Sequence, residues 1–306
     1  MTFTFTPRVL ALAGAAFLST SSAFADPMSL RRGEDGVEIG VQYSDYTYVE
    51  PQIMKNAGQK IGLTLTATTA VGANYFATLD TRYAFGDVEY SSSAQSANDN
   101  KDKLLDVRGL FGRDYDMGGY MLSPYTGFGV RQLHNDLRGT VFAGPGEAQD
   151  AGYRRESTYL YIPVGVTHRF HVQDGSARIS TTIEYDWFLS GTQKSRFGDV
   201  NNAPVLASVV DPGGCFTPVA VTSGGCTLSD VKNKQHDGYG VRLGIAYERA
   251  HWSVGLFYSM WSIKQSDTVV AASGGVLPGV FAASSSTVYE PKNRTQEFGI
   301  EAKYRF

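Results

Sequence analysis

The sequence has few charged residues and, beyond its N-terminus, no long apolar run. Asp, Glu, Lys and Arg make up 19% of the 306 residues, below the usual ~25%. A helical membrane protein is excluded, because no segment after the N-terminus has the ~18 consecutive apolar residues that a spanning helix needs. The net charge of −3 offers no basic surface for nucleic acid. Aromatic residues contribute 12%, which excludes a disordered chain.

Cysteine is almost absent, since Cys215 and Cys226 are the only two in the chain. The histidine nearest to them is His236, and the spacing of the two cysteines is not that of a compact metal site. A phosphate loop and a Gly-x-Ser-x-Gly elbow are also missing from the chain after residue 25. We therefore expect no metal and no cofactor. An even cysteine count in an exported protein predicts a Cys215–Cys226 disulfide.

The first 25 residues have the organisation of a secretory signal peptide. Arg8 precedes the apolar segment Val9–Leu18, and Ala23-Phe24-Ala25 fits an A-x-A cleavage site. The apolar run is too short for a membrane anchor, and a buried N-terminal helix is the less favoured alternative. We expect residues 1–25 to be removed and residues 26–306 to form one exported domain.

Alternation of apolar and polar residues runs through the rest of the chain, which is the pattern of β-strands. An example is Val37, Ile39 and Val41, which alternate with Glu38 and Gly40. Ten such segments can be placed: 36–48, 59–70, 74–91, 103–116, 120–137, 153–171, 177–192, 237–249, 251–265 and 294–306. Short connections alternate with long polar ones, which span 49–58, 92–102, 138–152, 193–236 and 266–293.

This order of short and long connections predicts an all-β fold, a ten-stranded antiparallel up-and-down transmembrane barrel with short periplasmic turns and long extracellular loops. A soluble β-sandwich has similar strands, but its turns do not sort by length to opposite ends. We expect the apolar face to meet outer-membrane lipid and lipopolysaccharide of a Gram-negative bacterium. Aromatic residues near strand ends, among them Tyr43, Tyr46, Tyr48, Trp187 and Trp261, predict interfacial girdles where they face outward.

The polar face predicts a charged interior. A barrel of ten strands lies near the size that side chains fill, so charges inside it must be paired. We expect a network of Asp80, Arg82, Asp106, Arg108, Arg131, Glu184, Asp186 and Arg242 across the lumen. The network is interpreted either as structural bracing of a plugged barrel or as the wall of a narrow, porin-like passage for small solutes.

Several stretches resemble a widespread family of predicted ten-stranded bacterial outer-membrane proteins. They are Tyr48-Val49-Glu50-Pro51 with Met54 and Gly58, Pro124–Gly129, Tyr153–Ser157, Glu184-Tyr185-Asp186 and Glu290–Asn293. The resemblance covers most of 36–306 and implies a barrel of the omptin-like superfamily, without implying an activity. The final Phe306, with Tyr304 two residues before it, resembles the motif that the outer-membrane assembly machinery binds.

The omptin-like resemblance raises one enzymatic hypothesis, a protease at the outer rim. Omptins place an Asp pair and an Asp–His pair there to activate water, and such general-base chemistry needs a histidine near carboxylates. The candidates are His236, Asp237, Asp99, Asp102, His134 and Asp136. His236 and Asp237 are adjacent and point to opposite faces of a strand, which departs from the family's alternate spacing. A third hypothesis is a surface-binding or adhesion role for the long loops.

Overall fold

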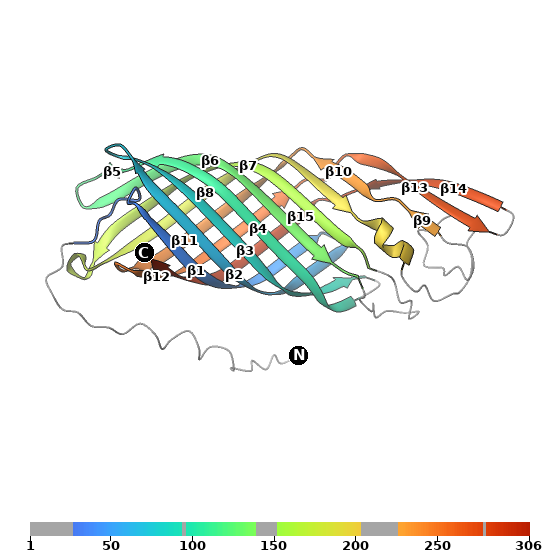
Figure 1. The fold of residues 1–306 in the computed structure, drawn as a ribbon, viewed down its shortest axis with the longest axis horizontal. Helices are drawn as coiled ribbons and strands as arrows, with labels where there is room; N and C mark the ends of the chain where they lie inside the picture. Colours follow the sequence, from blue (N-terminus) through green and yellow to red (C-terminus); the bar gives the residue numbers. More distant parts are fainter. Residues whose placement is uncertain (1–26, 94–95, 139–151, 203–225, 278–279) are drawn as a thin grey trace.

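The computed structural model describes residues 27–93, 96–138, 152–202, 226–277 and 280–306, and the predicted signal peptide lies outside them. Ten long antiparallel strands close into a barrel (Figure 1). They are β1 (Gly36–Glu50), β2 (Met54–Val71), β3 (Tyr75–Ser92), β4 (Ser96–Arg113), β6 (Tyr120–Asp136), β7 (Arg154–Val172), β8 (Ala177–Ser195), β11 (Gly238–Glu248), β12 (Trp252–Ile263) and β15 (Asn293–Arg305). Among the described residues, no helix is long and apolar enough to cross a membrane.

The barrel closes because its first and last strands pair. Strand β1 lies between β2 and β15, with Glu38 opposite Arg305 and Val49 opposite Arg294. A short β5 (Tyr115–Asp116) pairs with β6 at the end where the turns are tight. This short-turn end faces the periplasm in outer-membrane barrels, and we call it the periplasmic end and the opposite one the outer end.

The apolar stripe of each strand faces outward, as predicted. Leu79, Ile183, Leu243 and Ile300 are between 43% and 57% exposed, whereas Glu184 in the interior is 1% exposed. An exposed apolar belt around a polar interior inverts the arrangement of a soluble protein, and lipid is the solvent that stabilises it. The prediction of a transmembrane barrel is therefore confirmed.

The predicted bounds of two long loops, 49–58 and 92–102, were wrong, because the barrel strands continue into both segments. Strand β1 continues to Glu50 and β2 begins at Met54, so most of 49–58 is strand. Strand β4 already begins at Ser96. Beyond the lipid both faces of a strand tolerate polar residues, so the alternation that marks a strand in the sequence disappears. The other long segments also contain short elements: η2 (Phe197–Asn202), β9 (Cys226–Leu228), β10 (Val231–Gln235), β13 (Thr268–Leu277) and β14 (Val280–Tyr289).

Aromatic residues divide between the two faces of the barrel. Tyr43 and Trp187 are exposed toward the lipid, as a girdle requires, but Tyr46, Tyr48 and Trp261 are buried in the lumen. The parity of their positions explains the difference, because Tyr46 and Tyr48 lie an odd number of residues from Tyr43 and so point to the other face. The lumen of this barrel is consequently both charged and aromatic.

Candidate functional site

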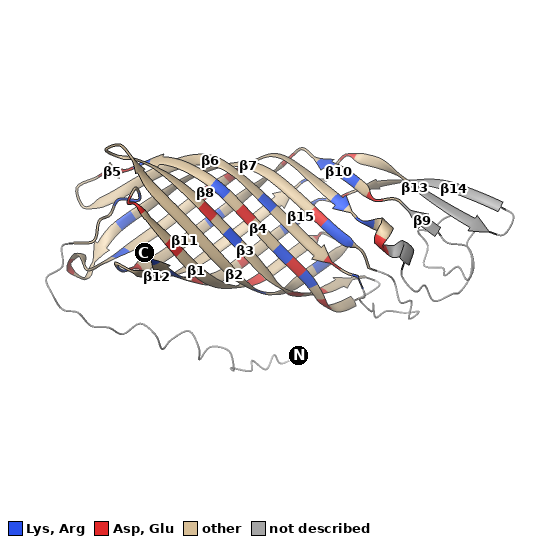
Figure 2. Ribbon diagram, in the orientation of Figure 1, with Lys and Arg blue, Asp and Glu red and all other residues tan. Residues whose placement is uncertain are grey.

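Arg242 of β11 lies at the centre of a layer of charged side chains that crosses the lumen. Its guanidinium lies 2.7 Å from carboxylate oxygens of both Asp106 on β4 and Asp186 on β8, and 3.1 Å from Glu184. It also donates to the Tyr161 hydroxyl at 2.9 Å. One cation thus joins carboxylates of the neighbouring strand β8 to a carboxylate of β4, which is not a neighbour of β11 in the sheet. Figure 2 shows acidic and basic residues interleaved along neighbouring strands.

The other residues predicted for this network lie in the same layer. Arg108 contacts Asp80 at 3.1 Å and also pairs with Glu184, and Arg131 lies 3.5 Å from Asp106. Arg82, which lies opposite Asp106 in the β3–β4 pairing, forms its ion pair outside the predicted set, with Glu297 of β15. Strands β3 and β15 are separated by β1 and β2, so only the curvature of the closed sheet brings these two side chains together.

Tyr161 connects the charged layer to the wall behind it. Its hydroxyl lies 2.5 Å from Asp106, and its ring lies over Gly129 so closely that a Cβ at position 129 would overlap the ring. Glycine at this position therefore allows the tyrosine to lie flat and to direct its hydroxyl toward the centre. The Gly129 position is one that charge patterning in the sequence does not reveal.

A second layer, which we call the aromatic layer, fills the lumen on the outer side of the charges. The Trp261 ring lies 5.0 Å from Tyr161 and 6.0 Å from Tyr159, and Tyr159 lies 5.7 Å from Phe188. The layer is completed by smaller apolar residues: Ala84, Leu104, Leu133 and Ile263. Arg131 lies over the Trp261 ring at 5.5 Å, so the aromatic and charged layers are in direct contact.

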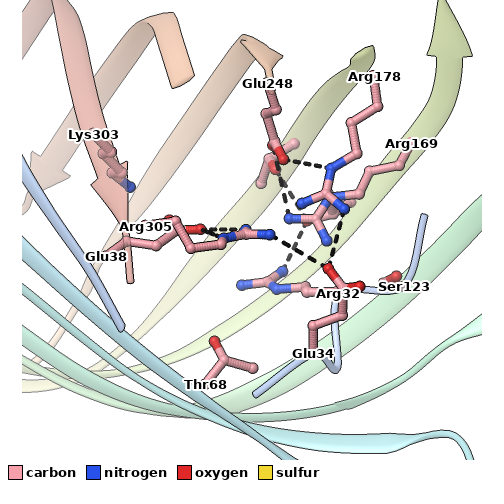
Figure 3. A network of polar contacts seen from close by, with 12 residues as sticks. Arg32, Glu34, Glu38, Thr68, Ser123, Arg169, Arg178, Glu248, Lys303 and Arg305 are labelled. Atoms are coloured by element: carbon pink, nitrogen blue, oxygen red, sulfur yellow. Dashed lines mark hydrogen bonds and ion pairs between the residues drawn. The ribbon is translucent and has the colours of Figure 1, made fainter. Parts of the chain in front are cut away.

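The periplasmic end of the lumen is covered by residues 27–35, which we call the N-terminal segment. Asp114 anchors it, because its carboxylate accepts the backbone N–H of Arg32 at 3.2 Å and of Gly33 at 2.9 Å. Arg169 of β7 also donates to the Arg31 carbonyl at 2.9 Å. Figure 3 shows Glu34 of this segment beside Arg305 and Arg178. The sequence did not predict that this segment covers the lumen, since nothing in its composition distinguishes it from an ordinary connection to the first strand.

At the outer end, three of the stretches that resembled the outer-membrane family meet in one cluster. Arg155 of β7 pairs with Glu50 and, at 2.7 Å, with Glu290. The Tyr48 hydroxyl lies 2.9 Å from an oxygen of each carboxylate, and Met54 lies against the same guanidinium. Burial raises the pKa of Glu290, which is the direction expected when two carboxylates share a single cation.

The candidates for a rim protease are not brought together. Asp102 is buried and pairs with Lys60, Asp136 pairs with Arg138 at 2.7 Å, and Asp237 pairs with Lys264. Three of the four candidate carboxylates therefore have lysine or arginine partners instead of histidine. His134 lies opposite Glu156 on the outward face of β6, while Asp99 and His236 are exposed. The protease hypothesis remains a prediction without a geometric basis in these residues.

Two further sequence predictions concern the ends of the chain and its cysteines. Cys215 lies outside the described residues, so the Cys215–Cys226 disulfide remains a prediction. Tyr304 and Phe306 are exposed on the outer wall, with their rings 5.0 Å apart. Their recognition by the assembly machinery also remains a prediction.

Comparisons with known proteins report similarity only to solved barrels. No family model matches the chain, and no curated protein does. The outer membrane protease OmpT from Escherichia coli has a TM-score of 0.48 and 9% identity, covering 89% of this chain and 97% of that one. The transport unit of the autotransporter AIDA-I from Escherichia coli has a TM-score of 0.41 and 10% identity, covering 91% and 93%. The toluene transporter TbuX from Ralstonia pickettii has a TM-score of 0.34 and 11% identity, covering 89% of each chain.

These similarities assign no activity, because the proteins named differ in what they do. The assignment of the chain comes from its own structure. Its closed sheet, exposed apolar belt and polar interior are the properties of a membrane-spanning barrel. The protein is a ten-stranded transmembrane β-barrel of the bacterial outer-membrane type.

Proposed function

We propose that the protein is a structural outer-membrane barrel whose lumen is closed to ions, and that it is not a porin. The observation that carries this proposal is the aromatic layer. Tyr159, Tyr161 and Trp261 are fully buried, and the Trp261 ring contacts both tyrosine rings inside the lumen. Ion passage requires a continuous column of water, and packed rings in contact leave no space for one.

The charged layer beneath the rings also differs from the wall of a porin. Arg242 and Arg108 each bind two or more carboxylates, so their charges are neutralised within the wall. Porin-like conduction depends on free charges beside a water-filled passage. In this barrel the charges bind one another, which supports a bracing role for the network.

The proposal is tested by conductance of the refolded protein in planar lipid bilayers. We expect no ion steps from the wild-type protein. Deletion of the N-terminal segment, residues 27–35, is expected to leave the bilayer silent, because the aromatic layer remains. The double variant Tyr159→Gly, Trp261→Gly removes two of the three contacting rings and is expected to admit current. Discrete steps from the wild-type protein would overturn the proposal.

A second candidate function is recognition at the cell surface, and the outer extension of the fold favours it. Strands β13 and β14 form a hairpin that pairs with β9 in a sheet separate from the barrel, beyond its outer end (Figure 1). Recognition sites are commonly carried by such projections from a rigid scaffold. Replacing residues 268–289 by a short turn is expected to abolish adhesion to host or matrix components in a plate assay while the barrel remains folded. Unchanged adhesion would remove this candidate.

A further inference from the structure

The periplasmic half of the lumen contains a cavity of about 250 Å³. Arg32 and Glu34 of the N-terminal segment line it from the periplasmic side, while Arg82, Arg108 and Arg242 of the charged layer line its inner end. A water molecule takes up about 30 Å³, so the cavity has room for about eight waters or for one small solute. The aromatic layer separates this cavity from the outer end of the barrel.

Hydroxyl groups are numerous in the cavity wall, beside its charged residues. Nine of its lining residues are threonine or serine: Thr64, Thr66, Thr68, Thr78, Thr167, Ser180, Thr182, Ser253 and Ser259. Two neighbouring pairs are bonded across strands, Thr68 with Thr78 and Thr167 with Thr182, each at 3.0 Å. A hydroxyl both donates and accepts hydrogen bonds, so this wall is suited to a solute that carries hydroxyls of its own.

Arg32 differs from the other charged residues that line the cavity. Every carboxylate of the lining has an arginine or lysine partner; these are Glu34, Glu38, Asp80, Glu184, Glu248 and Glu301. Among the described residues, no carboxylate is paired with the Arg32 side chain, which donates to Thr167 at 2.8 Å and lies 4.0 Å from the Tyr125 ring centre. A guanidinium held in this way is the group that proteins use to bind carboxylate or phosphate.

Other polar atoms of the lining residues also lack a partner. Gln42 Nε2, Arg82 Nε, Thr64 Oγ1 and Ser259 Oγ are buried and unpaired. All four atoms are able to donate a hydrogen bond. On the opposite wall Gly244 leaves open space, since a Cβ built there meets no atom closer than 3.9 Å. The cavity therefore has room for a ligand between Arg32 and the hydroxyl-bearing wall.

We propose that this cavity binds a small hydroxylated organic anion, a sugar acid or a sugar phosphate. The anionic group is bound by Arg32, and the hydroxyls of the solute are bound by the threonines and serines of the wall. This binding site goes beyond the closed-lumen function and needs no passage across the membrane. Binding is measured without a membrane potential, so its failure and the failure of the closed-lumen proposal are separate results.

The test is equilibrium dialysis of the detergent-solubilised full chain against three radiolabelled probes. Glucuronate has a carboxylate where glucose has a hydroxymethyl group and is otherwise the same. Glucose 6-phosphate carries a phosphate at the same position. Long equilibration is needed because the N-terminal segment covers the cavity. We expect saturable binding of one probe molecule per chain, with at least one anion bound about tenfold or more tightly than glucose. The anion with the higher affinity identifies the class.

Three variants locate the site. Arg32→Gln is expected to reduce anion affinity to that of glucose, and Arg32→Lys to restore part of it. Gly244→Leu fills the cavity and is expected to abolish binding of all probes. Its matched control is Gly109→Leu on the outward face of β4, where a Cβ meets no atom within 4 Å, and there binding is expected to be unchanged.

Three results would overturn the proposal. One is the absence of saturable binding by either anion, and another is equal affinity for glucuronate and glucose. The third is unchanged binding in the Gly244→Leu variant. Because Gly244 lies far along the chain from the N-terminal segment, this variant decides the question even if Arg32→Gln perturbs the segment.

Discussion

Replacing Arg242 with methionine is expected to lower the free energy of unfolding of the barrel by about 3–5 kcal/mol. The substitution keeps most of the side-chain volume but leaves Asp106, Glu184 and Asp186 without the cation that joins them. Carboxylates that lose a cation inside a barrel have no bulk water to replace it. Urea-induced unfolding in lipid vesicles, followed by tryptophan fluorescence, measures the effect.

The control for this prediction is Arg138→Met at the outer rim. Arg138 pairs with Asp136 at 2.7 Å, as closely as Arg242 pairs with its partners, but about half of its side chain is exposed. Exposed pairs contribute little to stability because water and salt screen them, so this variant is expected to unfold close to the wild-type urea concentration. Equal destabilisation by the two substitutions would show that burial of the lumen charges is not what makes Arg242 important.

Replacing Arg155 with methionine is expected to destabilise the outer end by about 3–5 kcal/mol at neutral pH, and acid is expected to relieve the defect. Glu50 and Glu290 share this guanidinium, and burial already raises the pKa of Glu290 above its ordinary value of 4.5. Loss of the cation raises that pKa further. A carboxyl whose pKa is raised on folding contributes stability below its unfolded pKa and loses that contribution as pH rises.

The neighbouring substitution Arg154→Met provides a control with a different pH range. Its partner Asp199 has a pKa lowered to about 2 by the hydrogen bond from Arg154, so their pairing is lost only as pH falls from about 3.8 toward 2. The defect of Arg155→Met is therefore expected to shrink already above pH 4.5, and that of Arg154→Met only below 3.8. Urea unfolding from pH 8 to pH 3 separates them, and a pH-independent defect in Arg155→Met would contradict the prediction.

The barrel itself was predictable because lipid imposes a simple rule on sequence. Residues that face lipid must be apolar, so strands such as β1 and β15 show strict alternation and their inward residues are identified by parity. The eight charged residues assigned to the lumen lie there for this reason. Parity also shows, in retrospect, that Trp261 points inward beside Tyr161.

Pairings between distant strands were not predictable in the same way. Arg82 binds Glu297 because the closed sheet curves enough to bring side chains of β3 and β15 together. The spacing of residues in the sequence does not predict that curvature. Arg155 similarly meets Glu50 and Glu290. The three residues lie in stretches that resemble an outer-membrane family, but the resemblance did not predict that they meet. Strand lengths beyond the lipid were missed because water permits polar residues on both faces there.

The sequence by itself determined the strand count, the face that meets lipid and the charged interior, since each follows from the alternation that a bilayer requires. Only the tertiary structure decided that aromatic rings close the lumen, that residues 27–35 cover its periplasmic end and that a hydroxyl-lined cavity lies between them. These features depend on side-chain packing between residues far apart in the chain, which the pattern of any single strand does not encode.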